Sequence, residues 1–369
     1  MGLKAYAQVN GVVRFVDVIA TLFHSPLPRE KGHLDMDSPP NAQGKDFEDM
    51  VCIGLFKYMA ASTQSTLFRN GKVLTRRDGD GSDASWTGVD LETRQMSVQD
   101  ARRLEATARC TLTHHGFEMR EYPLAPDLNF LEHDQVVERY FPQCTEIVRE
   151  ATGARFVAAF DYNIRSATGK DNQQRIKGGQ KVQGPAHVVH GDYTLTSAPQ
   201  RLRDLANPAS ANDALRTQLP DCVPLLDTTE VERILSGGRF AMINVWRNIT
   251  QEPVATQPLA LCDAASVKPE DLIVFEIHYQ DRIGENYFSK HADRHQWYYY
   301  RGLRRHEALL IKQWDSWGEL ARSNGARSDT HRADAPCTFS FHSAFEDPGT
   351  PPNAPDRWSI EVRCVTLYD

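Results

Sequence analysis

Residues 186–194 read Ala186-His187-Val188-Val189-His190-Gly191-Asp192-Tyr193-Thr194. The stretch is rich in β-branched and aromatic residues, which favours a strand. Side chains alternate between the two faces of a strand, so His190 and Asp192 are expected to point the same way. An imidazole and a carboxylate on one face offer two ligands to a transition-metal ion.

A second strand-like stretch lies much later in the chain and reads Cys337-Thr338-Phe339-Ser340-Phe341-His342-Ser343-Ala344-Phe345. His342 is the third candidate ligand. Two histidines and one carboxylate form a facial triad for iron, which leaves three coordination positions open; a 2-oxo acid can occupy two of them and dioxygen the third. The alternative is that His190 and His342 are packed, hydrogen-bonded strand residues, because a His-x-Asp pair also arises by chance.

The composition indicates an ordinary globular chain. The 369 residues are 40% hydrophobic and 25% charged, with a net charge of −7, which argues against a nucleic-acid partner. No apolar run is long enough to span a bilayer, and the N-terminus lacks the apolar core of a signal peptide, so we expect a cytoplasmic protein without membrane contact. Its seven cysteines are scattered without CxxC pairs, which indicates reduced thiols.

The spacing of apolar residues predicts a helix from Ser97 to about residue 112. It predicts a second helix over 134–151, which Pro142 should kink or split. Short helices are expected near 200–206 and 228–236. Strands are expected over 156–160, 186–195, 240–249, 272–279, 296–301, 308–314, 337–345 and 358–367.

Strands of this number with long connections suit a two-sheet jelly roll, also called a double-stranded β-helix. The predicted fold class is therefore α+β. No linker divides the chain, so we expect one domain over 1–369. Within it, 1–150 would form a mixed, helical N-terminal buttress and 151–369 the jelly-roll core.

The last predicted strand begins with Arg357-Trp358-Ser359-Ile360-Glu361-Val362-Arg363. The far carboxylate of a bound 2-oxo acid needs a cation in a dry pocket, and the planar fork of an arginine matches a carboxylate. Arg357 with Ser359 is one candidate anchor. Arg363 on the same face is the other, although Glu361 could neutralise it.

The chain resembles the fungal and bacterial oxygenase family that includes gibberellin desaturases, the cephamycin methoxylation component and the aspergillic-acid hydroxylase. The ordered set of matching segments spans more than half of the chain, and each segment alone is weak. The segments are Gly153–Asp161, Ile164-Arg165, His190–Thr194, Asn244–Arg247, His295–Tyr300, Glu307–Lys312, Asp315-Ser316, Phe341–Phe345 and Arg357–Arg363.

This resemblance implies a non-haem iron, 2-oxoglutarate-dependent dioxygenase that uses dioxygen. His190, Asp192 and His342 would bind Fe(II), and Arg357 with Ser359 would bind 2-oxoglutarate. The long Pro-rich gap between His342 and Arg357 keeps Arg363 open as the alternative anchor.

The resemblance also implies a small-molecule substrate of secondary metabolism whose unactivated C–H bond is oxidised. The outcome would be hydroxylation, desaturation or oxidative cyclisation, and one option is an aziridine made from an amino acid such as valine. The candidate substrate contacts are Asn244, Arg247, Ser343 and Phe345. The oligomeric state stays open, with a homodimer as one option.

Two other functions stay open. The chain could be a catalytically inactive or accessory jelly-roll subunit. It could also be a cupin-like metal-dependent isomerase or hydrolase, which would work with redox-inert zinc and would not consume oxygen.

Overall fold

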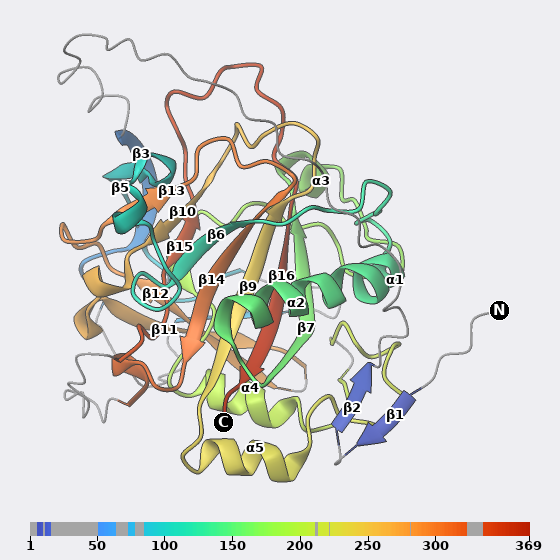
Figure 1. The fold of residues 1–369 in the computed structure, drawn as a ribbon. Helices are drawn as coiled ribbons and strands as arrows, with labels where there is room; N and C mark the ends of the chain where they lie inside the picture. Colours follow the sequence, from blue (N-terminus) through green and yellow to red (C-terminus); the bar gives the residue numbers. More distant parts are fainter. Residues whose placement is uncertain are drawn as a thin grey trace, which may run out of the picture.

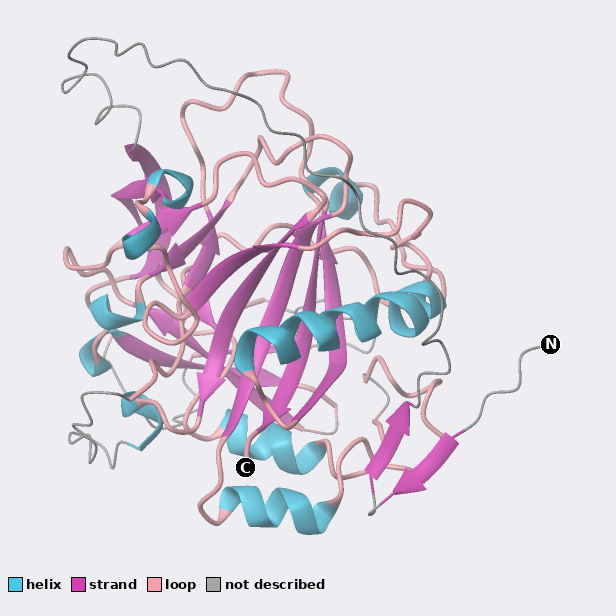
Figure 2. Ribbon diagram, in the orientation of Figure 1, coloured by secondary structure: helices cyan, strands magenta, loops and turns pink. Residues whose placement is uncertain are grey.

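The computed structural model describes residues 6–9, 12–15, 51–63, 73–77, 85–210, 213–220, 222–280, 282–322 and 335–369. Strands dominate these residues, and the helices lie at the periphery (Figure 2). Two strands, β1 (Tyr6–Val9) and β2 (Val12–Phe15), form a small antiparallel ribbon. The other strands form two sheets, of nine and of five strands.

The five-stranded sheet is antiparallel throughout and fills the centre of Figure 1. Its order is β6 (Phe117–Glu121), β14 (Glu307–Asp315), β9 (Phe240–Asn248), β16 (Ser359–Leu367) and β7 (Phe156–Arg165). In register, Arg363 of β16 stands between Asn244 of β9 and Asp161 of β7. Directly paired residues share a face of a sheet, so these three side chains lie together.

The nine-stranded sheet curls around the other side of the core. Its order is β3 (Val51–Met59), β5 (Leu91–Asp100), β13 (Trp297–Tyr299), β10 (Leu259–Cys262), β15 (His342–Ala344), β8 (His190–Gly191), β12 (Ile283–Ser289), β11 (Leu272–His278) and β4 (Leu74–Arg76). Two pairs, β13 with β5 and β11 with β4, are parallel. The candidate ligand strands β15 and β8 are neighbours at its centre.

The inner faces of the two sheets pack against each other. Leu261 and Tyr298 of the larger sheet share a buried cluster with Trp246, Leu309 and Ile311 of the smaller one. This two-layer arrangement confirms the predicted jelly roll.

The longest helix, α2 (Phe141–Thr152), packs on the outer face of the five-stranded sheet and crosses in front of it in Figure 1. It follows α1 (His133–Gln135) and a π-turn over Val136–Tyr140, with Pro142 in its first turn. Gly153 ends it with φ 63°, in the left-handed region that glycine tolerates. The predicted helix therefore forms, and it runs without a break from His133 to Thr152; its π-type turn ends directly before Phe141 and Pro142.

The remaining helices are short. They are α3 (Ala167–Asp171), α4 (Ser197–Asp204) and α5 (Thr228–Leu235), with 3₁₀ turns at Ala101–Arg103, Ala106–Ala108, Ala264–Ser266, Pro269–Asp271 and Glu319–Arg322. The helices expected near 200–206 and 228–236 are α4 and α5. None of the helices in the described ranges is long and apolar enough to cross a membrane.

The helix predicted from Ser97 to about residue 112 is wrong. Residues 91–100 form strand β5, in which Met96, Val98 and Asp100 are buried while Ser97 is exposed. This period of two arises because β5 pairs with β3 on one side and β13 on the other. The first part of the chain thus supports the core with α2 and also with strands β3, β5 and β6.

Candidate functional site

The three predicted metal ligands meet between the two sheets. His190 lies on β8, Asp192 follows that strand, and His342 lies directly opposite His190 on β15. The two imidazole ring centres are 4.2 Å apart, and His190 Nε2 is 3.7 Å from Asp192 Oδ1. One ligand atom from each residue lies within 4.8 Å of the other two. This spacing suits a single ion held by all three groups.

His190 is held as a neutral ligand. Its Nδ1 lies 2.8 Å from the carbonyl oxygen of Val188, which can only accept, so Nδ1 carries the proton and Nε2 is left to face the site. Burial and the neighbouring His342 lower the pKa of His190 to about 3. A neutral imidazole with its second nitrogen anchored is the form that binds metals.

Asp192 is held as a carboxylate. Burial alone would raise its pKa, but the Arg363 charge and the two histidines lower the pKa below the ordinary aspartate value. Arg363 Nε donates to Asp192 Oδ2 at 3.3 Å, and Asn244 Nδ2 donates to the same oxygen at 2.8 Å. The other oxygen, Oδ1, is the one that faces His190.

Gln313 supports the cluster from the opposite sheet, and sequence reasoning missed it. Its Oε1 accepts from the Asp192 backbone N–H at 3.0 Å, and its Nε2 lies 3.4 Å from His342 Nδ1. The register of β14 shifts between Lys312 and Trp314, which places Gln313 in a β-bulge. A bulge re-aims a side chain, and no local sequence pattern announces one.

Arg357 and Ser359 form a second polar group that could bind an anion. Arg357 is only 3% exposed, and its Nε has no hydrogen-bond partner within the described ranges; the same holds for the buried Ser359 Oγ. Arg357 donates from Nη1 to the Gln257 carbonyl and lies 5.6 Å from the Trp246 ring. Burial, followed by nearby Arg165, lowers the pKa of Arg357 to about 9. A buried cation without an acid bonded to it favours an anionic ligand.

Arg363, the alternative anchor, is already engaged. It donates to Asp161 Oδ2 at 3.0 Å as well as to Asp192. Burial opposes its charge, yet Asp192 and Asp161 raise its pKa above the usual arginine value. Arg363 therefore orients a candidate metal ligand, while Arg357 and Ser359 keep donors available.

Of the four candidate substrate contacts, the structure brings only Asn244 to the metal-ligand cluster. Asn244 lies in the site, where its Nδ2 also donates to Glu361 Oε1 at 2.7 Å. The carboxylate of Glu361 in turn lies 3.9 Å from His342 Nε2. The amide of Asn244 thus joins two acids of the site.

The structure does not bring Arg247 to the site. Arg247 is three residues beyond Asn244 on β9, so it faces the opposite side of the sheet. Its Nη1 donates to the carbonyls of Tyr122 and Arg305, and its guanidinium lies 5.7 Å from the Tyr140 ring beside α2. The predicted pocket role of Arg247 is therefore corrected to a structural one.

Ser343 and Phe345 also point away from His342. Ser343 Oγ donates to the Ala344 carbonyl at 2.8 Å and is fully buried. Phe345 stacks on Phe56 with ring centres 5.4 Å apart and meets Tyr299 edge-on at 5.5 Å. Alternation along β15 explains both positions, and Phe345 is a core residue.

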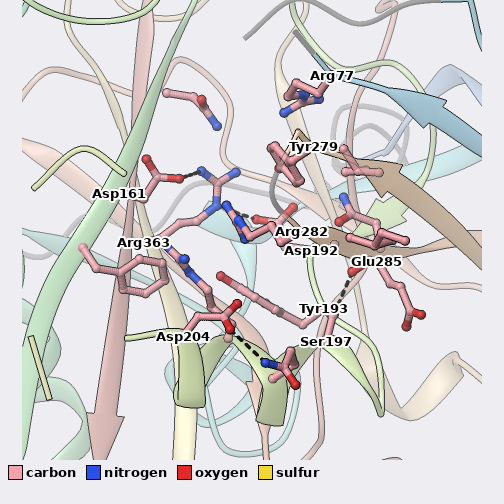
Figure 3. Close-up of a pocket in the computed structure, with 18 of the residues that line it drawn as sticks. Arg77, Asp161, Asp192, Tyr193, Ser197, Asp204, Tyr279, Arg282, Glu285 and Arg363 are labelled. Atoms are coloured by element: carbon pink, nitrogen blue, oxygen red, sulfur yellow. Dashed lines mark hydrogen bonds and ion pairs between the residues drawn. The ribbon is translucent and has the colours of Figure 1, made fainter. Parts of the chain in front are cut away.

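A cavity of about 140 Å³ opens beside His190 and Asp192 (Figure 3). Asp161, Arg165 and Arg363 line one side. The turn between β11 and β12 lines another with Tyr279 and Arg282, next to Arg77. In β7, Asp161, Asn163 and Arg165 are polar residues on one face of an otherwise apolar strand, a signal that could have identified this wall. The sequence carried no comparable signal for Tyr279 and Arg282.

The chain matches the family model of the oxidoreductase/YMDC permease-like domain over residues 56–367. A protein in the dcmA 3′ region of Methylophilus leisingeri is 40% identical over 194 residues, which cover 52% of this chain and 88% of that protein. The hydroxylase/desaturase poxK of Penicillium oxalicum is 26% identical, covering 77% of this chain and 82% of its own. The Fe(II)/2-oxoglutarate-dependent dioxygenase nvfI of Aspergillus novofumigatus is 29% identical over a stretch that covers 69% of this chain and 77% of that protein.

A solved structure of the iron and alpha-ketoglutarate-dependent endoperoxidase NvfI superposes with a TM-score of 0.65 at 22% identity, covering 87% of this chain and 99% of that one. This likeness shows a shared fold. The chain belongs to the oxidoreductase/YMDC permease-like family, because the family model covers most of its length. The predictions of a jelly-roll core and of an oxidoreductase are confirmed.

Proposed function

We propose that this chain is an Fe(II)- and 2-oxoglutarate-dependent dioxygenase acting on a small molecule. The observation that carries the proposal is the convergence of His190, Asp192 and His342, with ligand atoms within 4.8 Å of one another. Relatives named as a hydroxylase/desaturase and as an Fe(II)/2-oxoglutarate-dependent dioxygenase support it.

In this function His190 Nε2, the Asp192 carboxylate and His342 hold the iron. Two imidazoles and one carboxylate are the donor set of non-haem iron oxygenases. With dioxygen and a 2-oxo acid, such an iron centre supplies oxidation of an unactivated C–H bond. Arg363 and Asn244 donate to the Asp192 carboxylate, and Gln313 contacts His342 and the Asp192 backbone, so these residues orient the donor groups.

Arg357 and Ser359 bind the far carboxylate of 2-oxoglutarate. Both have buried polar atoms without partners among the described residues, and a carboxylate can accept from each. A planar guanidinium gives the two parallel hydrogen bonds that fix the orientation of a carboxylate. The Trp246 ring, 5.6 Å from the guanidinium, adds a cation–π contact to this buried cation.

The reaction is hydroxylation, desaturation or oxidative cyclisation of a small secondary-metabolism substrate. An amino acid such as valine, giving an aziridine, is one substrate to test. Arg247, one candidate cation for the carboxylate of that substrate, lies on the far face of β9. A different cation must therefore serve a substrate that carries a carboxylate.

The test is an anaerobic titration of the purified protein with Fe(II) and 2-oxoglutarate. We expect a weak visible charge-transfer band, and on admission of air we expect succinate. Asp192→Ala should abolish both. A band without succinate for any member of a substrate panel would favour an accessory subunit. Turnover with zinc and without oxygen consumption would favour an isomerase or hydrolase instead.

A further inference from the structure

The cavity beside the metal-ligand cluster carries a cation to which no carboxylate among the described residues is hydrogen-bonded. Two of the cations that line it have acid partners: Arg363 bonds to Asp161 and Asp192, and Arg201 bonds to Asp213 at 2.7 Å. Arg282 differs, because no carboxylate is bonded to it within the described ranges. Its Nε is buried and has no hydrogen-bond partner there.

An aromatic ring positions Arg282. The guanidinium lies 4.3 Å from the centre of the Tyr279 ring, and Arg77 approaches the same ring at 5.8 Å. Gly284 makes room for this ring, since a Cβ there would lie 3.2 Å from Tyr279 Cε2. Contact with the face of a ring leaves the N–H donors of a guanidinium available. Figure 3 shows Arg77 and Tyr279 on the side of the cavity opposite Asp161.

Two further acids that line the same cavity each accept a hydrogen bond through one oxygen. Asp204 accepts from Gln200 at 2.8 Å, and Glu285 accepts from Thr194 at 2.7 Å. Another cation of the cavity, Arg165, donates to the Gly184 carbonyl and stands beside Ser359 in register. Arg165 therefore belongs to the wall nearer the proposed 2-oxoglutarate anchor, and Arg282 to the opposite wall.

The cavity also limits the size of its occupant. Its volume of about 140 Å³ is close to that of an engineered protein cavity of roughly 150 Å³ that holds benzene. Most of its lining is polar, and Phe160, Ile277 and Ile283 add a smaller apolar surface. A ring-sized apolar group with one anionic end fits this combination.

We propose that Arg282, positioned by Tyr279, binds a carboxylate of the substrate, so that the enzyme acts on small organic acids. The inference rests on the proposed function, because it treats this cavity as the space in which the oxidised substrate lies. It assigns to Arg282 the role for which Arg247 is in the wrong place. Arg357 keeps the carboxylate of 2-oxoglutarate.

The experiment uses 3-phenylpropanoate and its primary amide as a matched pair of probes. Binding of each is measured by calorimetry, under anaerobic conditions, to protein loaded with Fe(II) and 2-oxoglutarate. We expect the acid to bind at least tenfold more tightly than the amide. Arg282→Gln should remove this preference, and Arg282→Lys should retain part of it. Arg216→Gln, which removes the same charge from an exposed position, should leave it unchanged.

Three binding results would each overturn the inference: no binding of the acid, equal binding of acid and amide to the unaltered protein, or an undiminished preference in Arg282→Gln. A raised 2-oxoglutarate requirement in Arg282→Gln would also overturn it, because Arg282 would then serve the cosubstrate. The visible band of the Fe(II) and 2-oxoglutarate complex is recorded separately. A missing band with an Arg282-dependent acid preference rejects the proposed function and leaves the anion site in place.

Discussion

Asn244 Nδ2 donates to Asp192 Oδ2 at 2.8 Å, so a residue of one sheet fixes the carboxylate of a candidate metal ligand that follows a strand of the other. Removing a hydrogen-bond partner of a metal ligand typically lowers metal affinity by about 10- to 100-fold. We therefore expect Asn244→Ala to raise the Fe(II) concentration required for the visible band by about that factor. An anaerobic iron titration measures it.

The control for Asn244→Ala is Asn207→Ala, because Asn207 is exposed and lies outside the cavity. The iron requirement of this control should equal that of the unaltered protein. An unchanged iron requirement in Asn244→Ala would show that the Asn244 contact does not orient Asp192 in solution.

Arg357→Gln should impair 2-oxoglutarate binding. Losing one partner of a buried charge pair costs about 2–5 kcal/mol, which corresponds to an affinity loss of about 30-fold or more. The half-saturating 2-oxoglutarate concentration of the visible band measures this loss. The iron requirement should stay within about threefold, because Arg357 makes no contact with the three candidate ligands.

Arg363→Gln should change the iron requirement, whereas Arg357→Gln should change the 2-oxoglutarate requirement. Arg363 bonds to Asp192 and Asp161, so its loss should raise the iron requirement and lower the free energy of unfolding. Iron titrations and urea unfolding measure the two effects. If Arg363→Gln instead raised only the 2-oxoglutarate requirement, the assignment of Arg357 as the anchor would be wrong.

Phe345→Ala should act on stability. Phe345 is fully buried between Phe56 and Tyr299, and truncating a buried phenylalanine costs about 3–5 kcal/mol. Urea unfolding should show this loss, while the iron affinity of the folded fraction stays unchanged. A large change in substrate preference without loss of stability would restore Phe345 as a substrate contact.

The seven cysteines should react unequally with a thiol reagent at pH 8. All of them are free. Burial raises the pKa of Cys110, Cys144 and Cys262 to about 12 and that of Cys337 to about 11. Because the thiolate is the reactive form, these four should react only as the pH approaches those values or after denaturation.

Cys222 is exposed and should react first. Cys222→Ser should remove the fast phase of a reaction with a disulfide reagent and leave the slow phases unchanged. A fast phase that persists in this variant would mean that one of the other six thiols, of which Cys52 and Cys337 are partly exposed, is the reactive one.

Local composition was sufficient to predict several strands that are buried on both faces and contain long apolar runs. The strands over 240–249, 272–279 and 308–314 appear as β9, β11 and β14 with ends shifted by one residue at most. Periodicity was insufficient for Ser97 and its neighbours, where an apolar spacing that fits a helix belongs to β5. Pairing with β3 and β13 outweighs such a weak local preference.

By itself the sequence determined the chemistry that is available, namely the His190, Asp192 and His342 donor set, the Arg357 and Ser359 pair and the α+β jelly-roll class. Only the tertiary structure decided how these groups are used. The β-strand pairings direct Arg363 to Asp192, turn Arg247, Ser343 and Phe345 away, and bring Gln313 and Arg282 to the site. The reason is physical: which face of a strand meets the cavity, and which distant strand lies beside it, depend on register and bulges formed between segments far apart in the chain.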